Sequence, residues 1–562
     1  MLFLFAALSR FIFLPYAEIT DADAVTRIFT ADDLINAPRI ISEGVWLPLH
    51  YYFISISILM SGELWYGPMI FHILIAAATV FPLYRFTARE FTERGAFWAV
   101  LVYCLSPIVF RNSFHALSGI PNAFLIALVL DALSSLRHTK SFGDAIKAGI
   151  YMTLACGFRY ESWLLFTLFT GMLLLFRVPW KKIAVFWLLG MIIPIFWMIG
   201  NYVAHGHLFY GITGVYNADV VEMQNADLDL TEKVKRLIFF PLSWVLNFSP
   251  LIAVTVVFLF FRKVFTGKLL KRHLLWMIPF IVIFIVFIYK SLEGTLLNQQ
   301  RFTILLILLA APFVSFITEL RNRIMKGILL LSVPFTFVWA FYAVYWDIDK
   351  YIPQERLRNV LSSIRLNTYS SLSPIPRQTD PEIRNVMAVI DENKEKCDGL
   401  LMDFWTWESS FCMALNSGFH HTDVFIVDGA VNGGVYEKQL ADFLRKHKNL
   451  MVLFNCSSEL LSYTNVVDHK LIFRLKQDEF TYPFYEIYSK DGMLIEKCTE
   501  DQGNKSMEFF SCPEKGTLSF YRMKIRQKLD MLNLIKQKAA SSNQSFENVL
   551  QNVAGRLFDD NQ

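Results

Sequence analysis

Long apolar segments alternate with short basic ones over residues 1–346, and this alternation limits the fold more than any other feature of the chain. A helix needs about 20 mostly apolar residues to cross a bilayer, with a range of about 17–25. Roughly eleven segments approach this length, although several are short. These candidate spans cover 2–17, 67–84, 95–112, 120–136, 145–158, 162–176, 183–203, 238–261, 273–290, 302–319 and 327–345. The sequence therefore predicts an α-helical polytopic membrane protein.

Composition supports this class and excludes others. Of the 562 residues, 54% are hydrophobic and 18% are charged, and the formal net charge is +4. Soluble domains carry about 25% charged residues, and a nucleic-acid binder needs a basic surface that so small a net charge does not suggest. The seven cysteines include no CxxC pair, so they indicate neither a zinc site nor a disulfide framework. We expect membrane lipids and no nucleic acid among the partners.

Lysine and arginine residues predict the orientation, because they are enriched in the cytoplasmic loops of membrane proteins. They gather in every second connection between the candidate spans, at 85–94, 137–147, 177–182, 262–272 and 321–326. We expect these connections in the cytoplasm and the alternate ones outside. With an odd number of spans, everything after Asp347 lies outside as well.

The first apolar segment, 2–17, has two interpretations. It has no basic flank, it contains Arg10, and no small-x-small cleavage site precedes Glu18. These features favour an uncleaved membrane anchor over a cleaved signal peptide.

The segment 148–176 is too long for one span, and a single span would bury Arg159-Tyr160-Glu161 in the middle of the membrane. It would also place Lys147 and Lys181 on opposite sides, against the charge rule. We therefore expect two short helices with the charged tripeptide at the outer turn between them.

The sequence divides into three expected domains: a transmembrane domain at 1–346, an extracytoplasmic α/β domain at 347–520 and a helical tail at 521–562. Short strand-like runs in the second domain occupy 400–404, 424–428, 450–454, 471–475 and 484–488, with a helix-like stretch at 437–447. The tail has a basic amphipathic pattern from about Tyr521 to Gly555, which fits a helix lying on lipid or one packed on its own domain.

Charged and polar side chains gather at the outer ends of the expected spans. They are Asp21, Asp23, Arg111, His115, Arg159, Glu161, Lys290 and Arg301. Ionisable groups in membrane spans are costly and usually functional, although long cationic side chains also anchor helices at the interface. Carboxylates beside cations at this level fit sugar transfer from a polyprenyl phosphate. A carboxylate takes the proton of the acceptor hydroxyl, and cations stabilise the departing lipid phosphate.

The first outer connection, 18–66, carries the strongest local signal. It begins with Asp21-Ala-Asp23 and continues to Trp46 and His50, and the apolar stretch 46–60 predicts a helix lying along the membrane surface. Two aspartates with this spacing can hold a divalent metal together with a diphosphate. A monophosphate donor does not need one, because cationic side chains can neutralise it. We expect no cofactor, with a divalent metal as the alternative.

The stretch Asp23-Ala-Val-Thr-Arg27, followed by Trp46-Leu47-Pro48-Leu49, resembles the polytopic GT-C glycosyltransferases. The likeness is closer to bacterial family-39-type enzymes, which include protein mannosyltransferases and the lipid A aminoarabinose transferase. Phe158-Arg159-Tyr160-Glu161-Ser162-Trp163 is similar to an arginine-containing turn of that group. The resemblance covers about 1–345, and the outer α/β domain also suits the group's architecture.

The resemblance implies an inverting transfer of sugar from undecaprenyl or dolichyl phosphate. Asp23 matches the catalytic aspartate of the first loop, and Asp21 is the other candidate. One departure concerns the start of the fourth span, where such enzymes often carry a glutamate. Here the stretch is Ser118-Gly119-Ile120-Pro121-Asn122, which leaves Asn122 as a hydrogen-bonding substitute.

The predicted site combines the residue chemistry with the resemblance. We expect Asp23 or Asp21 as the base. The expected ligands of the donor phosphate are Arg159, Arg301, Lys290 and Arg111. The expected substrate contacts are Trp46, His50, Glu161, Asn122 and His115.

The predicted function is an inverting glycosyltransferase that uses a polyprenyl-phosphate-linked sugar and a glycan, lipid or protein acceptor. A polysaccharide or oligosaccharide ligase and a lipid-linked glycan transporter are the alternatives, although transporters more often carry repeats and charges at the bilayer midplane. A sensor that binds a ligand through 347–562 is a further class. The family likeness favours a bacterial inner membrane with the active site outside. The sequons at Asn455, Asn504 and Asn543 keep the endoplasmic reticulum as the alternative.

Overall fold

The structure is a computed structural model, and it divides the chain into two compact units, 1–374 and 375–562. It describes residues 1–14, 17, 22–213 and 230–347 of the first unit, and 390–391, 394–403, 407–427, 443, 446–447, 449–453, 485–489, 494–498, 538, 549 and 553 of the second.

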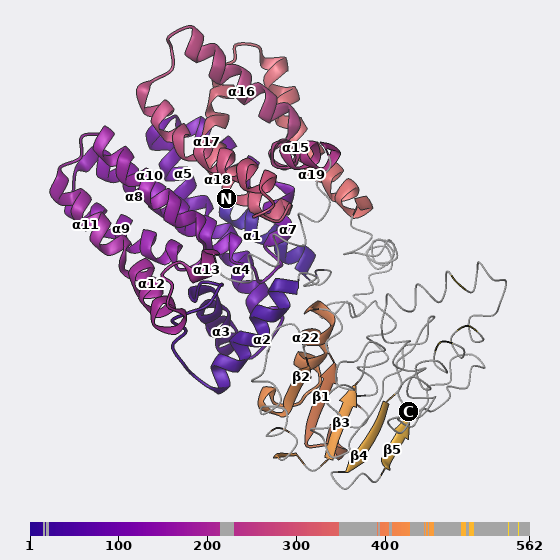
Figure 1. Cartoon of the computed structure of the whole chain (residues 1–562). Helices are drawn as coiled ribbons and strands as arrows, with labels where there is room; N and C mark the ends of the chain where they lie inside the picture. Colours follow the sequence, from indigo (N-terminus) through magenta and orange to yellow (C-terminus); the bar gives the residue numbers. More distant parts are fainter. Residues whose placement is uncertain are drawn as a thin grey trace. The chain divides into compact units, whose positions relative to one another are not determined.

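The described part of the first unit is built from helices (Figure 1). They are α1 (Leu2–Phe13), α2 (Ala22–Asn36), α3 (Leu49–Ser61), α4 (Tyr66–Ala78), α5 (Val80–Glu90), α6 (Glu93–Cys104), α7 (Pro107–Asn112), α8 (Gly119–Thr139), α9 (Phe142–Cys156), α10 (Glu161–Leu175), α11 (Trp180–Gly190), α12 (Ile192–His205), α13 (Tyr210–Thr213), α15 (Leu230–Asn247), α16 (Pro250–Phe265), α17 (Lys271–Leu292), η2 (Gln300–Phe302), α18 (Thr303–Ala310), η3 (Ala311–Glu319) and α19 (Arg323–Asp347).

Four helical segments among the described residues are long and apolar enough to cross a membrane: Tyr66–Glu90, Gly119–Thr139, Lys271–Leu292 and Gln300–Glu319. Two bent pairs, α11 with α12 and α15 with α16, pass the same test together, and α1, α3 and α10 are shorter apolar helices. The chain is an integral membrane protein with an α-helical polytopic architecture, as its sequence predicts. Several of the eleven expected spans correspond to two shorter helices each.

The core of this unit lies where α8 and α18 pack together. Every residue of α18, from Thr303 to Ala310, is buried. One face of α8 packs against α9 and another against α5. These two helices therefore fix the position of the segments that precede them in the chain, which end at Gly119 and Thr303.

The expected hairpin around Arg159-Tyr160-Glu161 is confirmed. Helix α9 ends at Cys156 and α10 begins at Glu161. Gly157 ends α9 where the chain meets the start of α3, and a Cβ atom there would lie 2.5 Å from Leu49 Cδ1. The Leu49 amide donates a hydrogen bond of 3.2 Å to the Gly157 carbonyl. The hairpin turn is thus tied to the first outer connection.

The expected span 238–261 is wrong as one continuous helix, because α15 and α16 meet at 104°. Ser249 has a φ of 73°, in the left-handed region, and Pro250 opens α16. Proline has no N–H with which to continue the hydrogen bonds of α15. The Ser249 hydroxyl lies 3.0 Å from Thr336 Oγ1 and 3.2 Å from Ser332 Oγ, so the break is held from α19.

A second finding concerns the start of the first outer connection, for which the sequence analysis expected no helix. It is the 15-residue helix α2. Ala24, Ile28 and Ala31 recur at helical spacing, and all three are fully buried. The Ser55 hydroxyl of α3 donates a hydrogen bond of 2.9 Å to the Ala31 carbonyl. Burial of this apolar face against α3 explains why the polar sequence is helical.

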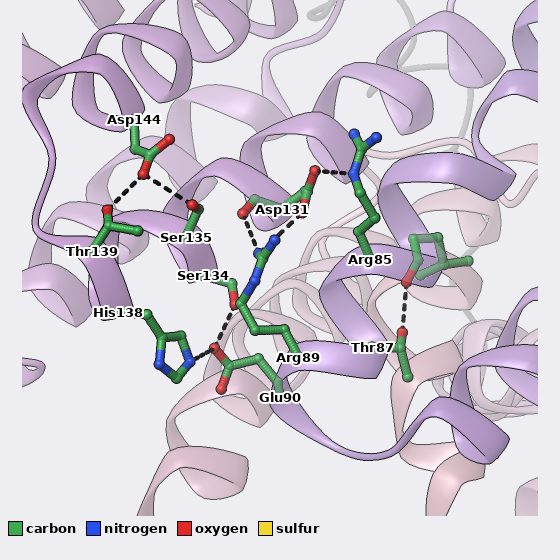
Figure 2. Close-up of polar contacts among 11 residues, drawn as sticks. Arg85, Thr87, Arg89, Glu90, Asp131, Ser134, Ser135, His138, Thr139 and Asp144 are labelled. Atoms are coloured by element: carbon green, nitrogen blue, oxygen red, sulfur yellow. Dashed lines mark hydrogen bonds and ion pairs between the residues drawn. The ribbon is translucent and has the colours of Figure 1, made fainter.

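Polar contacts fix α5 against the C-terminal half of α8 (Figure 2). Asp131 accepts hydrogen bonds from Arg85 Nε at 2.8 Å and Arg89 Nη1 at 3.0 Å. One turn later, the Ser134 hydroxyl donates to Glu90 Oε1 at 2.5 Å. The Glu90 side chain has no exposed surface. These contacts lie about 18 Å along α8 from its start at Gly119, since a helix rises about 1.5 Å per residue.

The second unit contains a five-stranded sheet in the order β2-β1-β3-β4-β5 (Figure 1). The strands are β1 (Gly399–Asp403), β2 (Val424–Val427), β3 (Asn449–Leu453), β4 (Tyr485–Ser489) and β5 (Leu494–Cys498), and α22 (Trp407–Asn416) connects the first two. Strands β1, β2 and β3 are parallel, with Leu400 opposite Val424 and Met451, whereas β4 and β5 pair antiparallel.

This α/β architecture agrees with the sequence prediction. Four of the five expected strands are present, and the sequence analysis missed β5. The expected strand 471–475 and most of the expected helix 437–447 and of the tail lie outside the described residues.

Candidate functional site

A cavity of about 200 Å³ opens where several segments of the first unit meet. They are α2, the residues 45–47 before α3, the entry to α8 at 117–119, the hairpin turn 158–161 and the segment 295–304 around η2. Among the described residues, its charged lining side chains are Asp23, Arg27, Arg159, Glu161 and Arg301. We call this space the arginine cavity.

Three elements carry these five side chains: helix α2, the turn that leads into α10, and the 3-10 turn η2. Asp23 and Arg27 are four residues apart on α2, so they lie on the same helix face. Glu161 is the first residue of α10. Arg301 lies in the 3-10 turn η2, directly before the buried helix α18. The site therefore depends on α2 in the first outer connection and on the hairpin and η2 far along the chain.

Asp23 and Arg301 form an ion pair. Arg301 Nη2 donates a hydrogen bond of 2.5 Å to Asp23 Oδ2, and the Arg301 and Asp23 side chains are 14% and 28% exposed, respectively. Burial by itself raises the pKa of Asp23, but the positive charges of Arg301 and Arg27 outweigh it, and the pKa lies below its usual value. Asp23 is therefore a carboxylate at neutral pH.

Arg159 and Glu161 form a second ion pair within the hairpin turn. Arg159 Nε donates to both carboxylate oxygens of Glu161, at 3.2 and 3.1 Å, and its Nη2 lies 2.5 Å from Oε1. Arg159 Nη1 donates a longer hydrogen bond of 3.4 Å to Ser118 Oγ. This turn between α9 and α10 is anchored to the entry of α8.

Phe302 connects the two ion pairs. Its ring centroid lies 5.1 Å from the guanidinium carbon of Arg159 and 5.7 Å from that of Arg301. A guanidinium within about 6 Å of an aromatic centroid is attracted to the ring. One aromatic side chain thus stabilises two like charges at the wall of the same cavity.

Arg27 differs from the other two arginines. It is 8% exposed, its guanidinium carbon lies 5.2 Å from the Trp46 ring centroid, and its Nη1 lies 3.0 Å from His50 Nδ1. Within the part of the chain that the structure describes, Arg27 has no carboxylate oxygen within 4.0 Å, and its Nε atom is buried without a hydrogen-bond partner. Arg27 is a cation of the cavity whose direct contacts are two neutral groups, while the carboxylate of Asp23 acts on its charge from farther away.

The structure brings together five of the predicted site residues. Asp23, Trp46, Arg159, Glu161 and Arg301 all line the arginine cavity. Asp21 lies outside the described residues.

The other predicted site residues do not line this cavity. His50 is fully buried behind Arg27. Asn122 is buried and accepts a hydrogen bond of 2.7 Å from Ser162 Oγ, so its side chain joins α8 to α10. His115 is buried in the connection before α8. Each of these three side chains is enclosed by protein, and their expected substrate contact stays a prediction.

Two expected phosphate ligands lie next to the lining rather than in it. Arg111 precedes Asn112, which lines the cavity. Lys290 is near the end of α17, and its carbonyl accepts a hydrogen bond of 3.0 Å from the amide of Thr295, another lining residue. Neither residue lines the cavity, and their expected contact with the donor phosphate stays a prediction.

The sequence analysis also missed residues of the site. Arg27 was noted only as a neighbour of Asp23, because α2 was not recognised; the i, i+4 spacing within a helix would have placed it in the cavity. Tyr160 donates a hydrogen bond of 3.1 Å to the Val45 carbonyl and accepts one of 3.0 Å from Trp197 Nε1, which fixes the segment that carries Trp46. Phe302 had no sequence signal beyond its position beside Arg301.

The fold is similar to that of solved GT-C membrane proteins. ArnT from Cupriavidus metallidurans bound to undecaprenyl phosphate is 13% identical, with a TM-score of 0.57, and the alignment covers 85% of this chain and 96% of ArnT. ArnT in the apo state matches at 13% identity with a TM-score of 0.56, over 85% of this chain and 95% of ArnT. The Archaeoglobus fulgidus oligosaccharyltransferase with zinc and sulfate is 14% identical, with a TM-score of 0.44, over 83% and 69% of the two chains.

No protein-family model and no curated protein sequence matches the chain. The chain therefore has a GT-C-like fold, as the sequence resemblance implied, and at this level of identity the similarity concerns the fold.

Proposed function

We propose that the protein is an inverting glycosyltransferase and that the arginine cavity is its active site. The enzyme moves a sugar from a polyprenyl phosphate to an acceptor hydroxyl of a glycan, lipid or protein. One observation carries the proposal: an ionised aspartate lies in a cavity beside three arginines, in a membrane protein with a GT-C-like fold. A base and several cations are the groups that this reaction requires.

The donor phosphate binds to the guanidinium groups. Arg27, Arg159 and Arg301 supply three positive charges, and Asp23 and Glu161 supply two negative ones, so the lining carries 3 − 2 = +1. Arginine can bind a phosphate through two parallel hydrogen bonds. Lys290 and Arg111 add positive potential from beside the cavity. This set of cations supports a phosphate ligand that needs no divalent metal, and metal independence is part of the proposal.

Asp23 acts as the base. It takes the proton from the acceptor as the acceptor atom attacks the anomeric carbon. The bond between that carbon and the phosphate oxygen breaks, and its electron pair stays with the lipid phosphate. Attack from the side opposite the leaving phosphate inverts the anomeric centre. Asp21, two residues earlier, is the alternative base.

The cavity faces the outer side of the membrane, in a bacterial inner membrane with the endoplasmic reticulum as the alternative. The support is the alternation of basic connections, which places 321–326 in the cytoplasm and the hairpin turn 158–161 outside. A topology reporter fused after Trp346 tests this orientation, and a reporter active only in the cytoplasm contradicts it.

The function is tested with the full-length protein and undecaprenyl phosphate. Binding is titrated in detergent micelles for the wild type and for Arg301→Gln, with Arg39→Gln as the matched control. Arg39 also pairs with an aspartate, Asp33, but lies outside the cavity lining. We expect saturable binding that Arg301→Gln weakens and Arg39→Gln leaves unchanged. Equal binding by all three proteins would contradict the proposal. Preference for undecaprenyl diphosphate over the monophosphate would favour a ligase instead.

A further inference from the structure

We infer that His50 and His72 are positioning residues that orient Arg27 toward the donor phosphate through a chain of hydrogen bonds. This inference rests on the proposed function, because it assigns a task to a cation of the same cavity. It also gives a role to two buried histidines outside the cavity lining.

The chain begins at the cavity and ends on a membrane-spanning segment. Arg27 Nη1 lies 3.0 Å from His50 Nδ1. His50 Nε2 lies 3.4 Å from His72 Nε2, and His72 Nδ1 lies 2.7 Å from the Pro68 carbonyl oxygen. Arg27 is on α2, His50 on α3, and His72 and Pro68 on α4. Three helices are thus linked in one line of polar atoms.

The chemistry of arginine sets every proton in this chain. A guanidinium only donates hydrogen bonds, so His50 Nδ1 must accept and carries no proton. A neutral imidazole then has its proton on Nε2, and His50 donates to His72 Nε2. His72 in turn has its proton on Nδ1 and donates it to the Pro68 carbonyl. Among themselves, the four groups are satisfied only with both histidines neutral and in opposite tautomers; the Leu117 backbone is a further polar group beside His72.

Burial makes the chain specific. His50 and His72 both have 0% exposed surface, so water does not replace either partner. The two histidine rings meet edge to face, with centroids 5.6 Å apart. The ring centroid of Phe53 lies 5.2 Å from that of His72, and the ring centroid of Phe158 lies 6.0 Å from that of His50. These aromatic neighbours fix the ring planes.

Arg27 depends on this support more than the other arginines of the cavity do. Arg159 and Arg301 are oriented by carboxylates. The Trp46 ring and His50 contact the Arg27 guanidinium, and Tyr51 and Asp23 act on its charge; among the described residues, only His50 accepts a hydrogen bond from it. A guanidinium held by a neutral imidazole keeps its full charge for a ligand. Loss of the acceptor therefore turns Arg27 away from the position in which it meets the phosphate.

A double-mutant cycle tests whether His50 acts through Arg27. The full-length wild type, His50→Leu, Arg27→Gln and the double variant are titrated with undecaprenyl phosphate in detergent micelles. We expect His50→Leu to weaken binding about tenfold, because a buried charged group loses its hydrogen-bond acceptor. In the Arg27→Gln background the same substitution should change binding by less than about twofold. An equal loss in both backgrounds would overturn the inference.

A conservative variant separates positioning from mere packing. In His50→Gln, the amide oxygen can accept from Arg27 and the amide nitrogen can donate to His72. We expect binding within about threefold of the wild type for His50→Gln and a loss for His72→Leu in the same direction as for His50→Leu. Equal losses for His50→Gln and His50→Leu would contradict the chain.

A second readout needs no ligand. Nitrogen NMR of protein labelled at histidine, assigned with His50→Gln and His72→Gln, reports which ring nitrogen carries the proton. We expect a proton on Nε2 of His50 and on Nδ1 of His72, and the reverse pattern would refute the chain. Absence of undecaprenyl phosphate binding by the wild type, with the expected tautomers, would instead count against the proposed function.

Discussion

Arg301 and Asp23 are separated by 278 residues, yet the guanidinium of one donates a hydrogen bond of 2.5 Å to the carboxylate of the other. The proposed base and one of the proposed phosphate ligands are therefore directly coupled. A phosphate that binds Arg301 competes with Asp23 for the same donors. If the proposed function holds, donor binding should weaken the hold on Asp23 and leave its carboxylate available to the acceptor.

The coupling predicts a change in pH dependence for Arg301→Gln. In the wild type, the pKa of Asp23 lies below the ordinary value of 3.8, so kcat/KM should lose no activity through this residue between about pH 8 and pH 5. Burial raises the pKa of Asp23 and Arg301 lowers it. Removal of Arg301 therefore moves the acidic limb of kcat/KM to higher pH.

The same pair has a consequence for stability. Because the folded-state pKa of Asp23 is lowered, its ionisation stabilises the fold above the ordinary pKa, and this contribution disappears as the pH falls through the lowered value.

The predicted shift of the acidic limb is measured as kcat/KM over the pH range for the wild type, Arg301→Gln and the control Arg39→Gln. An acidic limb at the same pH in all three proteins argues against coupling between Arg301 and Asp23.

The hairpin of α9 and α10 was predictable from local properties of the sequence, namely segment length and the position of charged residues. A charged tripeptide in the middle of a span is too costly, and 148–176 is too long for one span. These two constraints place the break at 159–161, and the structure has it at 157–160. The first strands of the second unit were predictable for a similar reason, since buried parallel strands read as short apolar runs.

Contacts between distant segments were not predictable in this way. No local pattern joins Asp23 to Arg301, because they lie on α2 and η2, which are far apart in the chain and meet only through tertiary packing. His50 was expected to touch substrate from its position in the first outer connection. The packing of α2 on α3 instead encloses it behind Arg27. The sequence indicated which residue types form the site but not which of them face the cavity.

Arg159→Lys should weaken donor binding while keeping the positive charge. Arg159 makes three contacts with Glu161 and one with Ser118, all of which use its planar fork. Lysine offers a single ammonium group and cannot bind a phosphate through two parallel hydrogen bonds. We expect a loss of affinity for undecaprenyl phosphate of about tenfold, measured by titration in micelles. The control is Arg39→Lys, and an unchanged affinity in Arg159→Lys would remove this side chain from the phosphate site.

Asp131→Asn should destabilise the fold without changing the chemistry. Its carboxylate accepts hydrogen bonds from Arg85 and Arg89 (Figure 2), and Arg89 is the less exposed of the two, at 30% against 55%. We expect a loss of about 1–2 kcal/mol in the free energy of unfolding, most of it from the Arg89 contact. Thermal unfolding in detergent gives the change in Tm. A large drop in kcat for the folded variant would show that this cluster communicates with the cavity.

The most direct test of the site compares Asp23→Asn with Asp21→Asn. Asparagine keeps the size of Asp23, and its amide oxygen can still accept the hydrogen bond from Arg301. It cannot take a proton from the acceptor. We therefore expect the rate of transfer to fall by about 10²–10⁴ in Asp23→Asn, while undecaprenyl phosphate still binds and the protein stays folded. Asp21→Asn should have a smaller effect.

Both variants are assayed side by side with a purified lipid-linked sugar donor, and Asp33→Asn serves as the control. Asp33 is also on α2 and also pairs with an arginine, but it lies outside the cavity lining. Full activity in Asp23→Asn together with a loss in Asp21→Asn would assign the base to Asp21. Full activity in both would exclude a base on the first outer connection, because no other carboxylate of that connection lines the described part of the cavity. Glu161 would then be the remaining carboxylate of the lining, and Glu161→Gln would be the next variant to assay.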